Sequence, residues 1–201
     1  KHLGKLDNEL RRMDGLVGEL LTLARLGNKT TQILYEDLLF NDFIANLVAD
    51  SVPLAEEKQQ LLQLQACEKP IIIHANEGYL YQAFDNVLRN AIKYSPVGST
   101  VRVNTARHDT GLSKHVAFAV TDEGPGIPKQ FQELIFEKFF RLDTRLVSER
   151  KGIGLGLSFC RLVVEAHGGS IWVDSPVMAE GAEEARGCRF TFTIPLGITD
   201  A

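Results

Sequence analysis

The most informative stretch of this chain is Gln82-Ala-Phe-Asp-Asn86-Val-Leu-Arg-Asn90-Ala-Ile-Lys93-Tyr94-Ser95. In a helix, spacings of four and three residues bring Asn86, Asn90 and Lys93 onto one stripe. The neighbouring face is apolar and would pack inward, through Leu80, Phe84, Val87, Leu88 and Ala91. Magnesium takes oxygen ligands and usually keeps waters and substrate phosphates, so an amide oxygen can bind it without a cage of carboxylates. The stripe is therefore suited to a metal-bound phosphate, with the lysine balancing the phosphate charge.

Composition limits the classes of protein that fit. The chain has 201 residues, of which 44% are hydrophobic, enough for one main domain with a helical appendage. A formal net charge of -4 argues against nucleic-acid binding, because such surfaces are typically basic. The odd set of Cys67, Cys160 and Cys188 has no metal-ligand spacing and fits a reducing cytoplasm. No apolar run approaches the roughly 18 residues of a membrane span.

We therefore expect a cytoplasmic domain with no nucleic-acid partner. The chain begins without methionine and inside a helical pattern, so we expect it to be a piece of a longer protein. A sensor portion and any membrane anchor of that protein would lie outside these residues.

Residues 1 to about 26 carry the repeat of a bundle-forming helix. Apolar residues recur in alternating steps of three and four, at Leu3, Leu6, Leu10, Met13, Val17, Leu20 and Ala24. Additional leucines exceed what a two-stranded zipper needs to bury, at Leu16, Leu21, Leu23 and Leu26. A four-helix bundle fits better, and Gly27-Asn28 would end the helix.

From about residue 31 the pattern becomes mixed. We expect strands over 31–35, 61–65, 71–74, 101–106, 116–121, 170–173 and 189–194. Helices are expected over 41–59, around Asn86 with Asn76 as N-cap, and over 155–167. The segment between Asp122 and Leu155 has the length and composition of a functional lid. The sequence thus predicts an α+β fold, a two-layer α/β sandwich with a mixed sheet and a mobile lid, preceded by one long bundle-forming helix.

A second motif, Asp122-Glu-Gly124-Pro-Gly126-Ile127, follows a predicted strand. The carboxylate could accept a hydrogen bond from an exocyclic amino group, while the glycines let a flat ring approach the backbone. Adenine presents that donor, whereas guanine presents a carbonyl oxygen there, and the lost hydrogen bond would cost on the order of 1–3 kcal/mol. Taken alone, the motif is better explained as a plain turn at a strand end.

A third motif, Gly152-Ile-Gly154-Leu-Gly156-Leu157, opens a predicted helix. Backbone amides at a glycine-rich helix N-terminus form a ready anion site, although close helix packing would also explain the glycines. Between the glycine motifs lie Phe136, Phe139 and Phe140, followed by Arg141 and Arg145. These phenylalanines suit a hinge or clamp that packs the lid, and a planar arginine cation suits a terminal phosphate.

In order along the chain, these segments resemble the ATP-binding catalytic domain of sensor histidine kinases, in the superfamily of gyrase and the heat-shock chaperones. The matching segments are 86–95, 122–126, 136–141, 152–157 and 187–195. The resemblance covers about residues 31–196, and residues 3–27 are similar to the second helix of the family's dimerisation and phosphoacceptor bundle. It implies two parts, a partial bundle helix at 1–27 and an ATP-binding catalytic domain at 31–201.

The resemblance also implies roles for the matching residues. Asn90 would be the main magnesium ligand with Asn86 beside it, while Lys93 and Arg141 would contact phosphates. Asp122 would recognise adenine. The rest of the implied ATP pocket and lid consists of Tyr94, Gly124, Gly126, Ile127, Phe139, Gly152, Ile153, Gly154, Leu155, Gly156 and Leu157.

Two sequence differences bear on chemistry, one from the related ATPases and one from the usual pattern of the kinases. The related ATPases carry a glutamate four residues before the metal-binding asparagine, where this chain has Asn86, and an amide cannot act as a general base for water. ATP would then be held intact until a nucleophile arrives. Cys188 stands where the family usually has Ser or Thr, which puts a hydroxyl-mediated contact near the adenine in doubt.

In the family the nucleophile is a histidine on a bundle helix, in the setting His-Glu/Asp-x-Arg-x-Pro. None of the five histidines here has that setting. His108 is interpreted as a solvated residue in a turn between strands, and His167 as a cap at a helix C-terminus, where a cation is mildly favourable. His2, His74 and His115 are interpreted as structural.

The leading hypothesis is therefore the catalytic domain of an ATP-dependent protein-histidine kinase. Its implied partners are ATP, its own phosphoacceptor helix, a response regulator and a second copy through the bundle. Two alternatives remain: a degenerate nucleotide-binding or dimerisation module without kinase activity, and a related ATPase or protein-serine kinase of the same fold.

Overall fold

The structure is a computed structural model that describes residues 33–110, 113–142, 153–177 and 186–196. From Leu34 onward these residues belong to one compact unit. The predicted bundle helix at 1–27 lies outside the described residues, so that helix and the division into two parts stay predictions.

Five strands form a mixed sheet in the order β2-β4-β5-β7-β6. Their bounds are Leu61–Gln65 for β2, Thr100–Thr110 for β4, Ser113–Thr121 for β5, Ser170–Asp174 for β6 and Arg189–Pro195 for β7. Strand β2 is parallel to β4, and the other neighbours are antiparallel. Strands β1 (Glu36–Leu39) and β3 (Ile72–Ala75) pair separately as a small antiparallel sheet.

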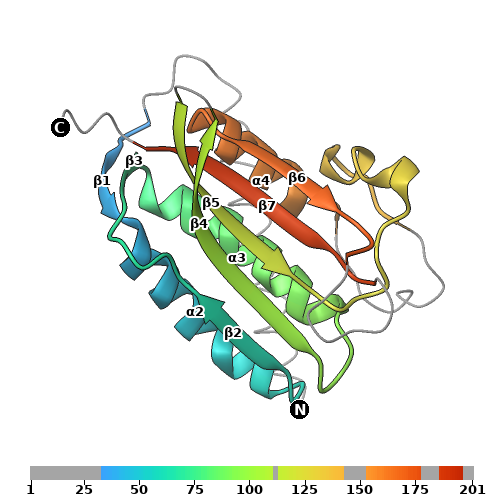
Figure 1. Ribbon diagram of the computed structural model, residues 1–201. Helices are drawn as coiled ribbons and strands as arrows, with labels where there is room; N and C mark the ends of the chain where they lie inside the picture. The colour runs from blue at the N-terminus through green and yellow to red at the C-terminus, as the bar shows by residue number, and fades with distance from the viewer. Residues whose placement is uncertain (1–32, 111–112, 143–152, 178–185, 197–201) are drawn as a thin grey trace, which may run out of the picture. The chain divides into compact units, whose positions relative to one another are not determined.

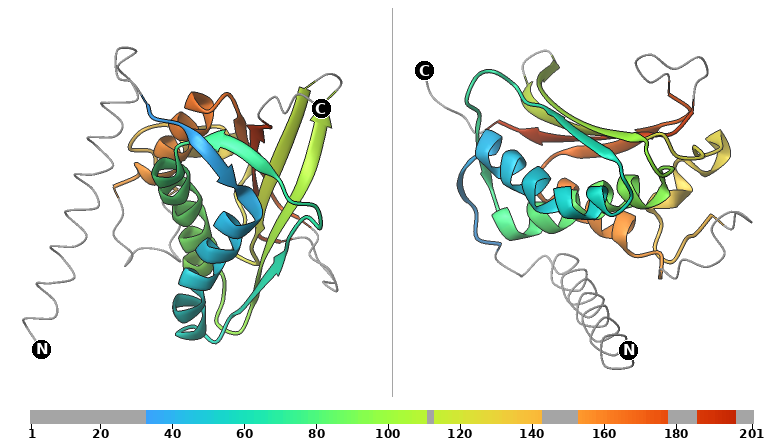
Figure 2. Two further views of the ribbon diagram at one scale, coloured as in Figure 1. Left: turned by 90° about the vertical axis from the view of Figure 1, so that its left-hand side faces the viewer. Right: turned by 90° about the horizontal axis from the view of Figure 1, so that it is seen from below.

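Three helices cover one face of the five-stranded sheet, as Figures 1 and 2 show. They are α2 (Phe40–Glu56), α3 (Glu77–Tyr94) and α4 (Gly156–Ala166). Two short 3-10 turns, η1 (Lys129–Phe131) and η2 (Leu134–Phe136), lie between β5 and α4. The predicted two-layer α+β sandwich with a mixed sheet is confirmed.

Aromatic packing fixes the orientation of α3. The Phe84 ring stacks on Phe118 of β5 at 4.4 Å between centroids and lies 4.7 Å from Phe192 of β7. All three side chains are fully buried. Because residues two, six and nine positions after Phe84 lie on roughly the opposite side of the helix, this packing turns the Asn86, Asn90 and Lys93 stripe away from the sheet.

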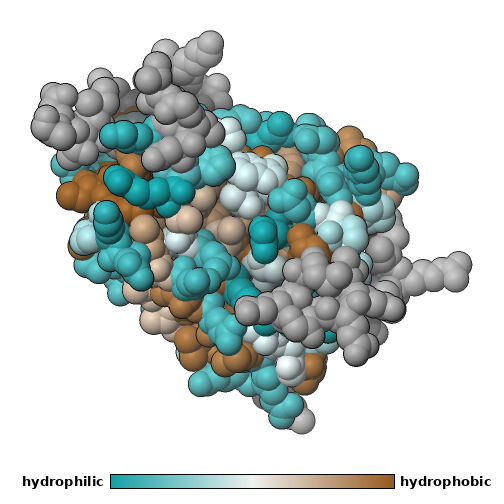
Figure 3. Space-filling view, in the orientation of Figure 1, coloured by the Kyte–Doolittle hydropathy of each residue, from teal (hydrophilic) through white to brown (hydrophobic). Residues whose placement is uncertain are grey.

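The other face of the sheet carries mostly small and polar side chains, with Trp172 as a large exception. One register row runs from Asn104 through Ala119 and Thr191 to Trp172. Figure 3 shows polar and apolar residues intermixed on this face. No helix in the described part of the chain is long and apolar enough to cross a membrane.

Two local predictions were wrong. Residues 33–35 form no strand, and β1 instead begins at Glu36, because its backbone pairs with β3 although its side chains are mostly exposed and give no alternating signal. His108 is not in a turn: β4 and β5 extend beyond the predicted 101–106 and 116–121, and His108 pairs in register with His115. The exposed ends of these strands are polar, so a hydrophobic pattern could not reveal them.

His167 caps the C-terminal end of α4, as predicted, but it is not the favourable cation that this position suggested. Its imidazole is buried, with Nδ1 2.7 Å from the Val163 carbonyl oxygen, while Nε2 accepts a 3.0 Å hydrogen bond from the Asn76 backbone N–H. A ring that accepts through Nε2 is neutral and donates through Nδ1. Burial lowers the pKa of His167, so this residue joins the end of α4 to the start of α3 as an uncharged bridge.

Candidate functional site

Helix α3 places the polar stripe. Its N-cap is Asn76, as predicted, whose Oδ1 accepts a 2.9 Å hydrogen bond from the Tyr79 N–H. Asn86, Asn90 and Lys93 are all half-buried on its outer side. The Asn86 Nδ2 is buried and has no hydrogen-bond partner among the described residues. A buried amide without an acceptor is costly unless something else supplies one, which is what a bound ligand does.

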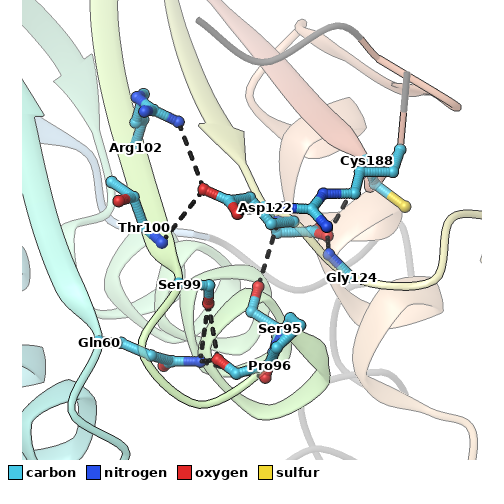
Figure 4. Close-up of polar contacts among 11 residues, drawn as sticks. Gln60, Ser95, Pro96, Ser99, Thr100, Arg102, Asp122, Gly124 and Cys188 are labelled. Carbon is cyan, nitrogen blue, oxygen red and sulfur yellow. Dashed lines mark hydrogen bonds and ion pairs between the residues drawn. The ribbon is translucent and has the colours of Figure 1, made fainter. Parts of the chain in front are cut away.

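The C-terminal end of α3 is held by Lys58 and Gln60, two residues that no sequence pattern singles out. Lys58 Nζ donates to the carbonyl oxygens of Ile92 at 2.7 Å, Lys93 at 3.0 Å and Ser95 at 2.6 Å. Gln60 Nε2 reaches the Pro96 carbonyl oxygen at 2.8 Å, and Figure 4 shows it beside Ser95, Pro96 and Ser99. An ammonium group at a helix C-terminus also suits the helix dipole. The last turn of α3, which carries Lys93 and Tyr94, is thereby fixed.

Asp122 lies at the end of β5 and is 4% exposed. Its Oδ1 accepts backbone hydrogen bonds from Gly124 at 2.8 Å and Cys188 at 3.2 Å (Figure 4). The second oxygen, Oδ2, has no hydrogen-bond partner among the residues that the structure describes. Burial raises the pKa of Asp122 to about 6, although the two N–H groups act in the opposite direction. The carboxylate is thus oriented by one oxygen and keeps the other for a donor.

Glycines bring the Asp122 loop against α3. A side chain at Gly124 would stand 2.8 Å from Asp122 Oδ1 and 3.4 Å from the Tyr94 carbonyl oxygen. The same two segments are joined by the Glu123 N–H, which donates to Ser95 Oγ at 3.3 Å. The Tyr94 ring is 40% exposed, and Lys93 Nζ lies 4.9 Å from its centroid. The predicted adenine-reading residue and the end of the polar stripe are therefore neighbours.

A hydroxyl group ties the next part of the loop to β6 and β7. Ser175 Oγ accepts from the Ile127 N–H at 2.7 Å and donates to the Gly187 carbonyl oxygen at 2.8 Å. Gln132 Nε2 donates to the carbonyl oxygens of Ile127 at 3.0 Å and Ser175 at 2.6 Å. Both backbone groups of Ile127 are therefore occupied by side chains from elsewhere in the fold.

The predicted hinge and the third glycine motif meet directly. Phe139 has a left-handed backbone with φ of 66°, is 64% exposed, and donates its N–H to the Gly154 carbonyl oxygen at 2.9 Å. A side chain at Gly154, whose φ is 80°, would lie 2.7 Å from the Phe140 carbonyl oxygen and 3.2 Å from Arg141 Cγ. The exposed Arg141 thus flanks Gly154, while Gly152 and Arg145 lie outside the described residues.

Helix α4 begins where this motif ends. Its N-cap, Leu155, offers no side-chain acceptor, so the first-turn N–H groups have no side-chain cap. A side chain at Gly156 would lie 3.6 Å from Asn86 Oδ1, so the start of α4 stands against the polar stripe. Leu155 is buried, whereas Leu157 is half-buried and Ile153 is 45% exposed. An uncapped helix N-terminus beside the Asn86 amide is suited to an anion such as a phosphate.

The geometry therefore brings together four segments that are separate in the sequence. Comparison with known proteins agrees. The family described as histidine kinase-, DNA gyrase B-, and HSP90-like ATPase matches residues 75–198, more than half of the chain. The chain belongs to this ATPase family.

Its relatives within the ATPase family are sensor kinases. The chain is 33% identical over 189 residues to the sensor histidine kinase WalK of Bacillus subtilis (strain 168), covering 94% of this chain and 29% of that protein. It is 35% identical over 191 residues to the adaptive-response sensory kinase SasA of Synechococcus sp. (strain JA-3-3Ab), covering 94% and 47%. The chain thus spans less than half the length of these curated relatives.

Solved structures of ATPase-family members superpose well. The mycobacterial sensor histidine kinase MprB is 30% identical with a TM-score of 0.66, covering 81% of this chain and 97% of that one. Full-length ShkA, solved in complex with AMPPNP, is 27% identical with a TM-score of 0.78, covering 98% of this chain and 38% of that one.

The polar stripe of α3 and the start of α4 together fit a metal-chelated phosphate. The described residues hold no cluster of three or more His, Cys, Asp or Glu side chains that could bind a metal. A magnesium ion here would depend on amide oxygens, phosphates and waters, which are ligands it accepts. The partnerless amide of Asn86 beside the start of α4 is the feature that such a group would satisfy.

Proposed function

We propose that this chain is the catalytic ATP-binding domain of a sensor protein-histidine kinase. It would transfer the terminal phosphoryl group of ATP to a histidine on a bundle helix outside this chain. The observation that carries the proposal is one juxtaposition: the amide stripe of α3 stands against the uncapped start of α4, next to an oriented carboxylate with one oxygen left for a donor.

Each residue has a distinct task in this proposal. The oxygen of Asn90 holds the magnesium ion, with the amide of Asn86 beside it, and the ion neutralises phosphate charge when bound. Lys93 and Arg141 contact phosphate oxygens. Asp122 accepts a hydrogen bond from the adenine amino group. The glycines of the third motif, Gly152, Gly154 and Gly156, let backbone N–H groups approach the phosphates.

The same residues leave water unactivated. Asn86 is an amide and cannot take a proton from water, so the site has no general base at that position. A neutral imidazole nitrogen from the bundle helix attacks the terminal phosphorus, the bond to the bridging oxygen breaks, and ADP leaves. This distinguishes the kinase from an ATPase of the same fold.

The partners follow from the same role. We propose a homodimer through the helical bundle and a response regulator aspartate as the next phosphoryl acceptor. WalK and SasA are sensor kinases, which supports the role from which these two partners follow.

Nucleotide binding tests the proposal. The chain should bind ATP in a magnesium-dependent manner and prefer ATP to GTP, measured by calorimetry with and without EDTA. Asn90→Ala should remove the magnesium dependence, whereas Asn46→Ala, an exposed asparagine on α2, should not change it. Equal affinity for ATP and GTP would refute the role given to Asp122, and metal-independent binding would refute the role given to Asn90.

A further inference from the structure

Ser175 lies where three segments meet: the end of β6, the loop that follows Asp122, and the residues just before β7. It directly follows β6, and its hydroxyl lies between the Asp122 loop and the segment that leads into β7. The single hydroxyl proton goes to the Gly187 carbonyl oxygen, and an oxygen lone pair accepts the Ile127 N–H. Both bonds are short, at 2.8 and 2.7 Å, so the hydroxyl cross-links two backbones and has no proton left to donate to a ligand.

The backbones run too close together for any side chain to separate them. A Cβ at Gly126, whose φ is 77°, would lie 3.1 Å from Ser175 Oγ. A Cβ at Gly187, whose φ is 74°, would lie 1.9 Å from the Asp122 carbonyl oxygen. The hydroxyl therefore acts inside a tightly packed arrangement, where a small shift at Gly187 moves Asp122.

A short chain of bonds leads from Ser175 to the carboxylate. Gly187 accepts from Ser175, and the next residue, Cys188, donates its N–H to Asp122 Oδ1 at 3.2 Å. On the other side, Gln132 holds the Ile127 carbonyl oxygen and the Ser175 carbonyl oxygen together. Ser175 is thus linked to the Asp122 carboxylate through Gly187 and Cys188, and it is bonded directly to the Ile127 backbone.

The Ser175 hydroxyl matters because position 188 is a cysteine, where the family usually has a hydroxyl residue. Cys188 is buried, and its Sγ lies 3.6 Å from Ser175 Oγ. Burial, together with the nearby charge of Asp122, raises the pKa of the Cys188 thiol to about 12, so it stays a thiol with a weak S–H donor. Position 188 therefore offers only this weak donor, and the hydroxyl that links the Ile127 and Gly187 backbones belongs to Ser175.

We propose that Ser175 is a specificity-positioning residue, whose hydroxyl fixes the Gly126–Ile127 backbone against Gly187–Cys188 and thereby aims Asp122 at the amino group of adenine. This inference rests on the proposed ATP-binding function. It assigns base selectivity to a residue that does not touch the base.

The main test compares Ser175→Ala with wild type for binding of ATP and GTP in the presence of magnesium. The alanine leaves the Ile127 N–H without its acceptor and the Gly187 oxygen without its donor, so the ATP preference should fall about ten-fold. Most of the loss should be in ATP affinity, while GTP affinity changes little. Ser175→Thr keeps a hydroxyl and should restore most of the preference.

Two further variants provide an independent test and a control. Gln132→Met removes the second tie to Ile127 and should also lower the preference, which carries the test if Ser175→Ala does not fold. Ser170→Ala, an exposed serine at the other end of β6, is the matched control and should behave as wild type.

The outcomes separate this inference from the proposed function. If wild type shows no magnesium-dependent preference for ATP, the proposed function fails. If wild type shows the preference and folded Ser175→Ala and Gln132→Met keep it, only the role of Ser175 is overturned. Equal weakening of ATP and GTP by Ser175→Ala would show a general structural role and would also overturn it.

Discussion

Replacing Asp122 by asparagine should make the protein more stable while removing its preference for ATP. The pKa of Asp122 is raised from 3.8 to about 6 in the folded protein, because burial disfavours the charge. A displacement of about two pKa units corresponds to a destabilisation of about 3 kcal/mol when the group is ionised. An amide at this position can still accept both N–H bonds and carries no charge. We expect Asp122→Asn to raise the free energy of unfolding by about 2 kcal/mol at pH 7.5, since burying the amide retains part of the cost.

The sign of the pH dependence follows from proton counting. Between about pH 4 and pH 6 the folded protein holds a proton on Asp122 that the unfolded chain has released, so stability falls as pH rises through this window. The cost is fully present above pH 6. Urea unfolding followed by circular dichroism at pH 7.5, 6.5, 5.5 and 5.0 measures it. By pH 5.0 the gap between variant and wild type should shrink by about 1.4 kcal/mol.

The control is Asp174→Asn, an exposed carboxylate at the end of β6, which should change stability by less than about 0.5 kcal/mol. A variant less stable than wild type at pH 7.5, or a gap that does not change with pH, would refute this reasoning. A confirmed gain in stability with loss of ATP preference would show that the carboxylate is kept for binding, at the expense of folding.

Three further outcomes are expected. Lys58→Met should destabilise the protein by about 2–3 kcal/mol and weaken ATP binding, because three carbonyl oxygens at the end of α3 lose a charged donor, whereas the exposed Lys69→Met should be nearly neutral in urea unfolding and calorimetry. Gly187→Ala should cost about 3 kcal/mol or more in thermal unfolding, from its left-handed backbone and the overlap at 1.9 Å, whereas Gly78→Ala in the first turn of α3 should be neutral or stabilising. In an NMR titration the His167 ring should gain its proton only below pH 6.5, and a midpoint above 6.5 would contradict the neutral bridge between α3 and α4.

The sequence was sufficient to predict the elements whose apolar residues recur with a helix or strand period. The apolar face of α3, the alternation in β5 and β7 and the cap at Asn76 each follow from local patterns, and the structure has them where they were expected. The order of the polar and glycine motifs pointed to the family that the comparisons show.

What the sequence could not reveal depends on contacts between distant residues. Lys58 bonds to carbonyls more than thirty positions away, and Ser175 bonds to Ile127 across 48. Neither residue lies in a recognisable motif, because backbone oxygens and N–H groups leave no trace in the sequence of their partners. The bounds of strand β1 were predicted wrongly for a similar reason. Its position depends on backbone pairing with β3, whereas its own side chains are mostly exposed and show no strand pattern.

The central claim is that the amide stripe of α3 holds magnesium-bound ATP for transfer to a visiting histidine. Its most direct test supplies a separate phosphoacceptor helix pair and ATP labelled in the terminal phosphate, and follows label on the helix. Wild type and Asn46→Ala should transfer at the same rate, and Asn90→Ala should be slower by at least about a hundred-fold. Transfer by Asn90→Ala at the wild-type rate would contradict the account.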